Sequence, residues 1–166
     1  MPPYILLGLD MKTDGIDLKI LHELQRNAKL TNTELAERIN LSPSPCLKRV
    51  KQLERSGLIN SYVALLDPAS IGLNLNVFIF ISLKAQGREL LSDFESRVTS
   101  HDEVMECYLM TGEEDYLIRV AVPDVPALER FIVDSLSPMP EVEKIRSSVA
   151  LKQVRYKTAL PLRKQL

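Results

Sequence analysis

A short stretch of the sequence, residues 42–55, concentrates positive charge in a chain that is almost neutral as a whole. It contains Lys48, Arg49, Lys51 and Arg55 against the single acid Glu54, whereas all 166 residues together carry a formal net charge of −1. Lysine and arginine side chains that share one helix face can neutralise the phosphates of a nucleic acid, although a solvated helix face has the same composition. The stretch is therefore a candidate nucleic-acid contact.

A second candidate lies far along the chain, in a Thr-Gly-Glu-Glu-Asp-Tyr segment at residues 111–116. Gly112 permits a positive φ, and Asp115 supplies a carboxylate where a strand is expected to begin. A free α-amino acid could place its ammonium at that carboxylate and its own carboxylate at the N–H groups of the loop. A charged loop that is simply solvated is the more common case, and by spacing alone the signal is weak.

Enzyme signatures are missing. The six glycines are too far apart for a dinucleotide-binding or P-loop motif, and the two histidines belong to no zinc-protease motif. Cys46 and Cys107 are widely separated, without a CxxC pair, so we expect two free thiols rather than a disulfide or a zinc site. We expect a protein that is not an enzyme and that has no metal or cofactor.

No apolar run approaches the ~20 residues that a membrane-spanning helix needs. The first ten residues contain an apolar patch but lack a basic start and a small-residue cleavage site, so they are expected to be a tail. These features predict a cytoplasmic protein that does not interact with membranes.

Three short helices are predicted before Gly57. The first spans about residues 14–27, and the second begins at a capping box formed by Thr31 and Glu34. Ser42 is placed to cap the third, with Pro43 at its first position, and the helix ends near residue 56. A helix, a short helix, a tight turn and a basic helix make the helix-turn-helix plan.

The third helix has an apolar ridge and an exposed polar side. Leu47, Val50 and Leu53 form the ridge, and the opposite side and its flanks carry the side chains available to DNA. We expect base contacts from Ser44, Pro45, Lys48, Arg49 and Gln52, and phosphate contacts from Lys51 or Arg55, with Ser42 at the helix start. Thr31, Asn32 and Thr33, at the start of the second helix, are expected to reach phosphates.

Beyond residue 57 the hydrophobic period changes. A strand is expected over residues 58–66, followed by elements in the order strand, helix, strand, strand, helix, strand. Their expected ranges are 75–85, 89–99, 104–110, 116–122, a helix capped by Asp124 that carries Leu128 to Leu136, and 142–156. This is the ferredoxin-like βαββαβ plan, an antiparallel sheet with both helices on one face.

The first strand of that sheet is apolar on both faces. Residues 77–81 read Val-Phe-Ile-Phe-Ile, so the face away from the helices also needs a cover. A second copy of the chain is the simplest cover, which predicts a sheet-to-sheet dimer. A tail or helix of the same chain is the alternative.

Four stretches of the sequence form a recognisable set: Asp14-x-x-Asp17-x-x-Ile20-Leu21, the Ser-Pro-Ser-Pro-Cys run at residues 42–46, Gly57-x-Ile59-x-x-Tyr62 and Thr111-Gly112-x-x-Asp115-Tyr116. Together they closely resemble the Lrp/AsnC family of prokaryotic transcription regulators. The resemblance covers nearly the whole chain from Met11. Thr13 departs from the pattern, since the family often has leucine before the first Asp, and the first ten residues resemble an extension.

The resemblance implies an α+β chain with an N-terminal winged helix-turn-helix and a C-terminal ferredoxin-like effector domain. It implies double-stranded DNA as a partner, an amino acid as effector, and dimers that assemble further, in an octamer of four dimers. The effector site would lie at a contact between dimers, with Thr111, Gly112, Glu113, Asp115 and Tyr116, and with Ser147 and Ser148 nearby.

The expected boundaries are a tail at 1–10, a DNA-binding domain at 11–60, a hinge at 61–73, an effector domain at 74–158 and a tail at 159–166.

Two other functions are considered beside a DNA-binding regulator. One is an amino-acid-binding regulatory subunit of an enzyme, and the other is an enzyme on a ferredoxin-like fold. The basic face of the third helix favours the DNA-binding protein.

Overall fold

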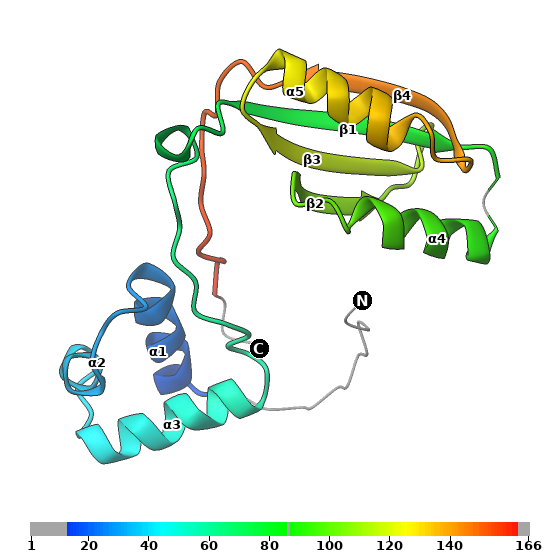
Figure 1. Ribbon diagram of the computed structural model, residues 1–166. Coiled ribbons are helices and arrows are strands. Elements are labelled where there is room, and N and C mark those ends of the chain that lie inside the picture. Colours follow the sequence, from blue (N-terminus) through cyan, green and yellow to red (C-terminus); the bar gives the residue numbers. More distant parts are fainter. Residues whose placement is uncertain (1–12, 86, 163–166) are drawn as a thin grey trace. The chain divides into compact units, whose positions relative to one another are not determined.

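The computed structural model describes residues 13–85 and 87–162, which form two compact units (Figure 1). The helical unit contains residues 13–64 together with residues 155–162, and the sheet unit contains residues 65–154. Residues 155–158, expected in the effector domain, therefore group with the helices. The expected N-terminal tail and the last four residues of the expected C-terminal tail lie outside the described residues.

Three helices build the helical unit: α1 (Gly15–Arg26), α2 (Asn32–Arg38) and α3 (Pro43–Arg55). Their starts follow from capping chemistry. Asp14 caps α1 in a reciprocal box with Asp17, and Thr31 caps α2 in the predicted box with Glu34. Ser42 occupies the capping position of α3, but its side chain makes no capping hydrogen bond. The predicted N-cap position of Ser42 is thus confirmed, and the start of α3 is fixed by Pro43 rather than by a bond from the Ser42 hydroxyl.

The three helices meet on a small apolar core. Its buried members are Ile20, Leu35, Ala36, Ile39, Cys46 and Leu53. Asn40, with φ of 56°, makes the sharp turn between α2 and α3, a conformation that asparagine tolerates better than most residues. Burial raises the pKa of the Cys46 thiol, as expected for a buried free cysteine.

The strand expected over residues 58–66 does not form. Residues 60–66 are exposed and adopt no regular structure, because no other strand of the described chain offers them a ladder of hydrogen bonds. Tyr62, in this segment, donates its hydroxyl to Glu54 Oε1 at 3.0 Å. Partial desolvation of its hydroxyl, followed by this bond, raises the pKa of Tyr62 to about 12. The contact ties the segment to the end of α3.

The C-terminal residues of the helical unit contact α1. The side-chain amide of Gln25 accepts from the backbone N of Leu160 at 2.6 Å and donates to the carbonyl of the same residue at 3.4 Å. Leu162 lines a pocket of about 400 Å³ together with Leu18 of α1 and Ile39 after α2. The chain thus returns to the helices after completing the sheet unit.

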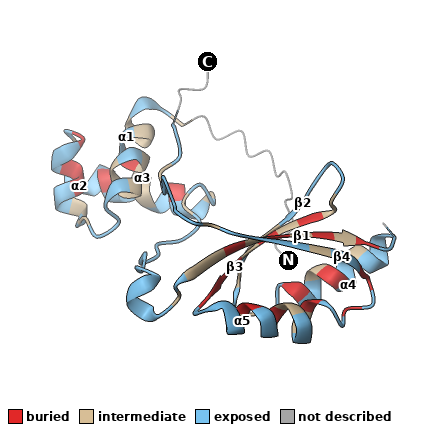
Figure 2. Cartoon of the chain, turned by 90° about the horizontal axis from the view of Figure 1, so that it is seen from above, coloured by how far each residue is buried: buried red, intermediate tan, exposed pale blue. Residues whose placement is uncertain are grey.

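The sheet unit has the predicted βαββαβ order. After the short helix η1 (Ala69–Ile71), it contains β1 (Leu75–Leu83), α4 (Arg88–Val98), β2 (Val104–Leu109), β3 (Tyr116–Val122), α5 (Val125–Arg130), η2 (Phe131–Leu136) and β4 (Val142–Val149). The strands pair antiparallel in the order β2-β3-β1-β4, and α4 and α5 cover one face (Figure 2). This is the ferredoxin-like topology.

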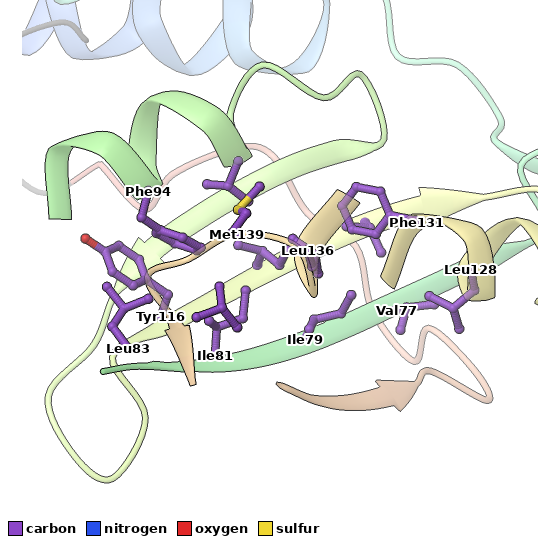
Figure 3. Packing of buried hydrophobic residues seen from close by; sticks show 14 of the residues in the cluster. Val77, Ile79, Ile81, Leu83, Phe94, Tyr116, Leu128, Phe131, Leu136 and Met139 are labelled. Atoms are coloured by element: carbon purple, nitrogen blue, oxygen red, sulfur yellow. The ribbon is translucent and has the colours of Figure 1, made fainter. Parts of the chain in front are cut away.

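Strand alternation decides which residues enter the core between sheet and helices. Val77, Ile79 and Ile81 of β1 are fully buried and pack with Phe94 of α4 and Phe131 of η2 (Figure 3). Residues of the other parity in β1, which include Phe78 and Phe80, are only half-buried. Phe78 and Phe80 therefore lie on the sheet face away from the helices.

Two predicted elements differ in detail. The helix capped by Asp124 continues from α5 into the π-helical turn η2, where Ser137 N donates to the carbonyl of Ile132 at 2.8 Å. The wider turn brings Phe131 and Leu136, five residues apart, into one core. β4 ends at Val149 rather than at residue 156 because its partner β1 begins at Leu75.

Across the described ranges, none of the helices combines the length and the apolar character that spanning a membrane would require.

Candidate functional site

The exposed side of α3 carries the predicted row of polar and basic side chains. Cys46 and Leu53 are buried on the opposite side, which fixes the rotation of the helix. Nine of the eleven predicted DNA contacts are exposed: Thr31, Thr33, Ser42, Ser44, Pro45, Lys48, Lys51, Gln52 and Arg55. The helix thus presents cationic and hydrogen-bonding groups on one side, as a nucleic-acid contact requires.

Asn32 is one of the two exceptions, because its side chain joins α2 to the start of α3. Its Nδ2 donates to the carbonyl of Pro43 at 2.8 Å, and its Oδ1 is buried. Asn32 was expected to contact a phosphate. In this structure it instead holds the turn of the helix-turn-helix, since Pro43 opens α3.

Arg49 is the other exception, and it faces α1. Its Nη1 donates to Asp14 Oδ2 at 2.7 Å and to Asp17 Oδ1 at 2.8 Å. These hydrogen bonds, that of Asp17 first, raise the pKa of Arg49. The backbone N–H of Asp17, and to a smaller extent the Arg49 guanidinium, hold the pKa of Asp14 below its ordinary value. Arg49 was expected to read a guanine, but the structure places its guanidinium on two carboxylates.

The acidic loop joins β2 to β3 at one end of the sheet. Thr111, Gly112 and Glu113 are exposed, and Gly112 has a φ of 141°, which favours glycine. Asp115 is half-buried, and its Oδ2 accepts from the backbone N of Leu83, at the end of β1, at 2.7 Å. The carboxylate therefore anchors the loop to the neighbouring strand.

Tyr116 belongs to the core rather than to the loop surface. It is 1% exposed, its ring lies 4.6 Å from that of Phe94, and its hydroxyl donates to Glu95 Oε1 at 2.8 Å. Burial, followed by the bond to Glu95, raises the pKa of Tyr116. The expectation that Tyr116 contacts an effector is not supported, because Tyr116 shares the helix-covered face with Ile118.

The two serines of β4 lie on opposite faces of the sheet. Ser147 is opposite Ile79 and Ser148 is opposite Phe78, so the two hydroxyls cannot line one pocket together. Both positions are also further along β1 from the loop than Ile81, whose carbonyl accepts from Asp115 N. The structure thus places Ser147 and Ser148 two and three positions along β1 from Ile81, on separate faces of β4.

A pair of residues that sequence reasoning missed links the loop to β4. Arg146 Nη2 lies 2.6 Å from Glu114 Oε1, and its guanidinium carbon lies 4.2 Å from the centre of the Phe80 ring. In the sequence, the opposite charges of Glu114 and Arg146 were the only hint of this contact. Glu114 stands in a run of three acids, so charge alone did not single it out. The contact couples the acidic loop to the open face of the sheet.

That open face combines apolar rings with a polar network. Phe78 is opposite Arg119, and Phe80 is opposite Leu117. Arg119 in turn bonds Glu106 on β2, with its Nη2 2.6 Å from Oε1, and Arg119 holds the pKa of Glu106 below its ordinary value. The face thus combines apolar rings with the ion pair of Arg119 and Glu106, a mixture that suits contact with another protein surface.

Comparisons with known proteins agree with this architecture. Residues 13–60 match winged helix-turn-helix DNA-binding domains, and residues 76–160 match the Lrp/AsnC ligand binding domain. The leucine-responsive regulatory protein of Klebsiella pneumoniae is 38% identical over 150 residues, which cover 90% of this chain and 92% of the relative. The leucine-responsive regulatory protein of Escherichia coli K12 is 37% identical with the same coverage.

Solved structures show the same likeness. A transcriptional regulator from Neisseria meningitidis, in complex with L-Met, superposes with a TM-score of 0.86 at 43% identity and covers 90% of this chain and 96% of its own. An AsnC family transcriptional regulator from Agrobacterium tumefaciens also reaches 0.86, at 37% identity, and covers 90% of this chain and 97% of its own. A helix-turn-helix with an exposed basic helix precedes a ferredoxin-like ligand-binding unit, and the chain belongs to the Lrp/AsnC family of DNA-binding transcription regulators.

Proposed function

We propose that the chain recognises a DNA sequence with α3 and that an amino acid bound at the sheet unit modulates this binding. The observation that carries the first part is the exposed row on α3, whose opposite side is fixed in the core by Cys46 and Leu53. Lys48 and Gln52, with Ser44 and Pro45 near the helix start, enter the major groove.

Phosphates are contacted by the basic side chains Lys51 and Arg55 and by Thr31 and Thr33 at the start of α2. These four side chains are exposed. Such contacts fix the position of the protein on the duplex and give binding its dependence on salt.

Selection from a random pool of duplexes tests the DNA-binding proposal. We expect the wild type to enrich one sequence, and Lys51→Ala to reduce the slope of log K against log salt by about one. Arg130→Ala, which removes an exposed charge from α5 in the sheet unit, is the matched control and should leave the slope unchanged. Failure to enrich any sequence would refute the proposal.

The effector is proposed to be an α-amino acid that binds at residues 111–115. Support comes from the loop itself, with its positive-φ Gly112 beside the carboxylates of Glu113 and Asp115, and from the relatives described above. One of those relatives is named leucine-responsive and another was solved with L-Met, so L-Leu and L-Met are the first probes. Asp115 is assigned to the effector ammonium and the loop N–H groups to the effector carboxylate.

Calorimetric titration with each of the two amino acids, with D-Met as the matched control, tests the effector assignment. A site that recognises the ammonium, the carboxylate and the side chain together is stereospecific, so we expect heat from an L-amino acid and none from D-Met. Equal affinity for L-Met and D-Met would refute the assignment.

Assembly is proposed to begin with a dimer formed through the open face of the sheet, and four such dimers to form an octamer with the effector site between dimers. The apolar rings of Phe78 and Phe80 on this face support the first step. Light scattering at micromolar concentration tests it. A mass of 18.8 kDa, that of one chain, would refute the dimer.

A further inference from the structure

The ion pair between Arg49 and two aspartates joins the basic helix to the beginning of α1. One atom, Nη1 of Arg49, donates both hydrogen bonds, at 2.7 Å to Asp14 and 2.8 Å to Asp17. The Asp17 side chain is only 15% exposed, and that of Arg49 is 31% exposed. The Asp14 side chain is 49% exposed, so the contact is shielded from solvent mainly at Asp17.

The local sequence explains why the two carboxylates converge. Asp14 and Asp17 form the capping box of α1, in which each side chain accepts from the backbone N–H of the other residue. The box places both carboxylates at the start of the helix, three residues apart. Arg49 can bridge the two carboxylates because Nη1 carries two N–H groups, one for each acid, held in the plane of the guanidinium.

Position along α3 explains why Arg49 is the residue that reaches them. Arg49 follows the buried Cys46 by three residues and precedes the buried Leu53 by four, so it borders the buried side of the helix. Its neighbour Lys48 is exposed. Two adjacent basic residues therefore have different surroundings.

Moving Arg49 from this place to a DNA contact would leave two carboxylates facing each other, one of them mostly buried. Removing one partner from a partly buried ion pair is more costly than the pair itself is favourable. The two acids would also repel the DNA phosphates once their cation had left.

We propose that Arg49 is a positioning residue that fixes α3 against α1 without contacting DNA, and that Asp14 and Asp17 support DNA binding despite their negative charge. This proposal rests on the proposed function, in which α3 reads the DNA. The triad then sets the orientation in which Lys48, Lys51 and Gln52 face the groove.

The proposal makes an unusual prediction for Asp17→Asn. Removal of an acid near a DNA-binding surface ordinarily strengthens DNA binding, because it lowers the repulsion of phosphates. If Asp17 acts by holding Arg49, Asp17→Asn instead weakens binding to a duplex that the wild type has selected from a random pool. We expect a loss of about tenfold for Asp17→Asn and for Arg49→Met, and a double variant no weaker than the worse single one.

Salt dependence and sequence discrimination distinguish positioning from a phosphate contact and from general destabilisation. Arg49→Met should leave the slope of log K against log salt unchanged, whereas the control Lys51→Ala reduces it by about one. Arg49→Met should also lower the ratio of affinities for the selected duplex and a scrambled duplex, measured where circular dichroism shows folded protein. The conservative Arg49→Lys, which keeps a cation beside the acids, should restore part of that ratio.

If Asp17→Asn does not fold, DNA binding by Asp14→Asn is measured instead. Asparagine is a good capping residue, so α1 keeps its start while one of the two carboxylates at Arg49 loses its charge. A salt slope reduced by about one in Arg49→Met, together with equal or tighter binding by Asp14→Asn, would overturn the proposal and make Arg49 a phosphate contact. Failure of the wild type to select any duplex would refute the proposed function, and this proposal with it.

Discussion

Two substitutions at Asp115 separate its structural contact from its proposed contact with an effector. Its carboxylate accepts from the backbone N of Leu83 at 2.7 Å, and Leu83 is 5% exposed. In Asp115→Ala that N–H loses its partner where water has little access. In Asp115→Asn the side-chain oxygen can still accept the bond, but the negative charge is gone.

The magnitudes follow from this geometry. A buried donor without a partner costs about 1–3 kcal/mol, so Asp115→Ala should lower the unfolding temperature of the sheet unit by roughly 5–15 °C. Asp115→Asn should lower it by no more than about 3 °C, because the hydrogen bond is kept. For the effector, loss of a charge-assisted bond of about 2 kcal/mol predicts an affinity about thirtyfold weaker in both variants.

Differential scanning calorimetry and titration with the amino acid that binds the wild type measure the two effects on the same preparations. Equal thermal stability of Asp115→Ala and the wild type would refute the role of the Leu83 contact. Wild-type effector affinity in the folded Asp115→Asn variant would refute the ammonium assignment and restrict Asp115 to anchoring the loop.

Three further predictions follow from other contacts. Tyr116→Phe removes the hydroxyl bonded to Glu95, so it should cost about 1–2 kcal/mol in chemical denaturation while amino-acid affinity stays unchanged, and a loss of affinity would return Tyr116 to the effector site. Phe80→Asp should give a folded monomer in light scattering, and an intact dimer would exclude the open face as the interface. Glu106 has a pKa lowered by Arg119, so its contribution to stability is present above pH 4.5 and is lost as the pH falls through the folded-state pKa. Glu106→Gln should therefore flatten the loss of stability below pH 4.5, and an unchanged acid profile would contradict this.

Local chemistry made the helices and the sheet order predictable. The capping box at Thr31 and the proline at the start of α3 mark helix starts that the structure confirms. The predicted strand at residues 116–122 is confirmed. It was predictable because the apolar pattern that marks a strand lies within the strand itself. These signals need no knowledge of distant residues.

Elements that depend on a distant partner were not predictable in the same way. Residues 58–66 have strand-like composition, but a strand forms only where another edge supplies hydrogen bonds. The length of β4 likewise depends on where β1 begins.

Candidate site residues show the same division. The exposure of Lys48 and Gln52 follows from helical periodicity alone, whereas the contact of Arg49 requires the placement of α1 beside α3. The opposite faces of Ser147 and Ser148 could have been predicted, because adjacent residues of a strand always alternate.

The helical unit consists of the first and the last described segments of the chain, with the whole sheet unit between them. During synthesis the three helices leave the ribosome before the sheet unit, but Leu160, which pairs with Gln25, follows only after β4 has been made. Synthesis of the helical unit thus begins before that of the sheet unit and ends after it. A chain that ends after β4 contains α1, α2 and α3 of the helical unit. It lacks Leu160 and Leu162, which contact α1 in the complete unit.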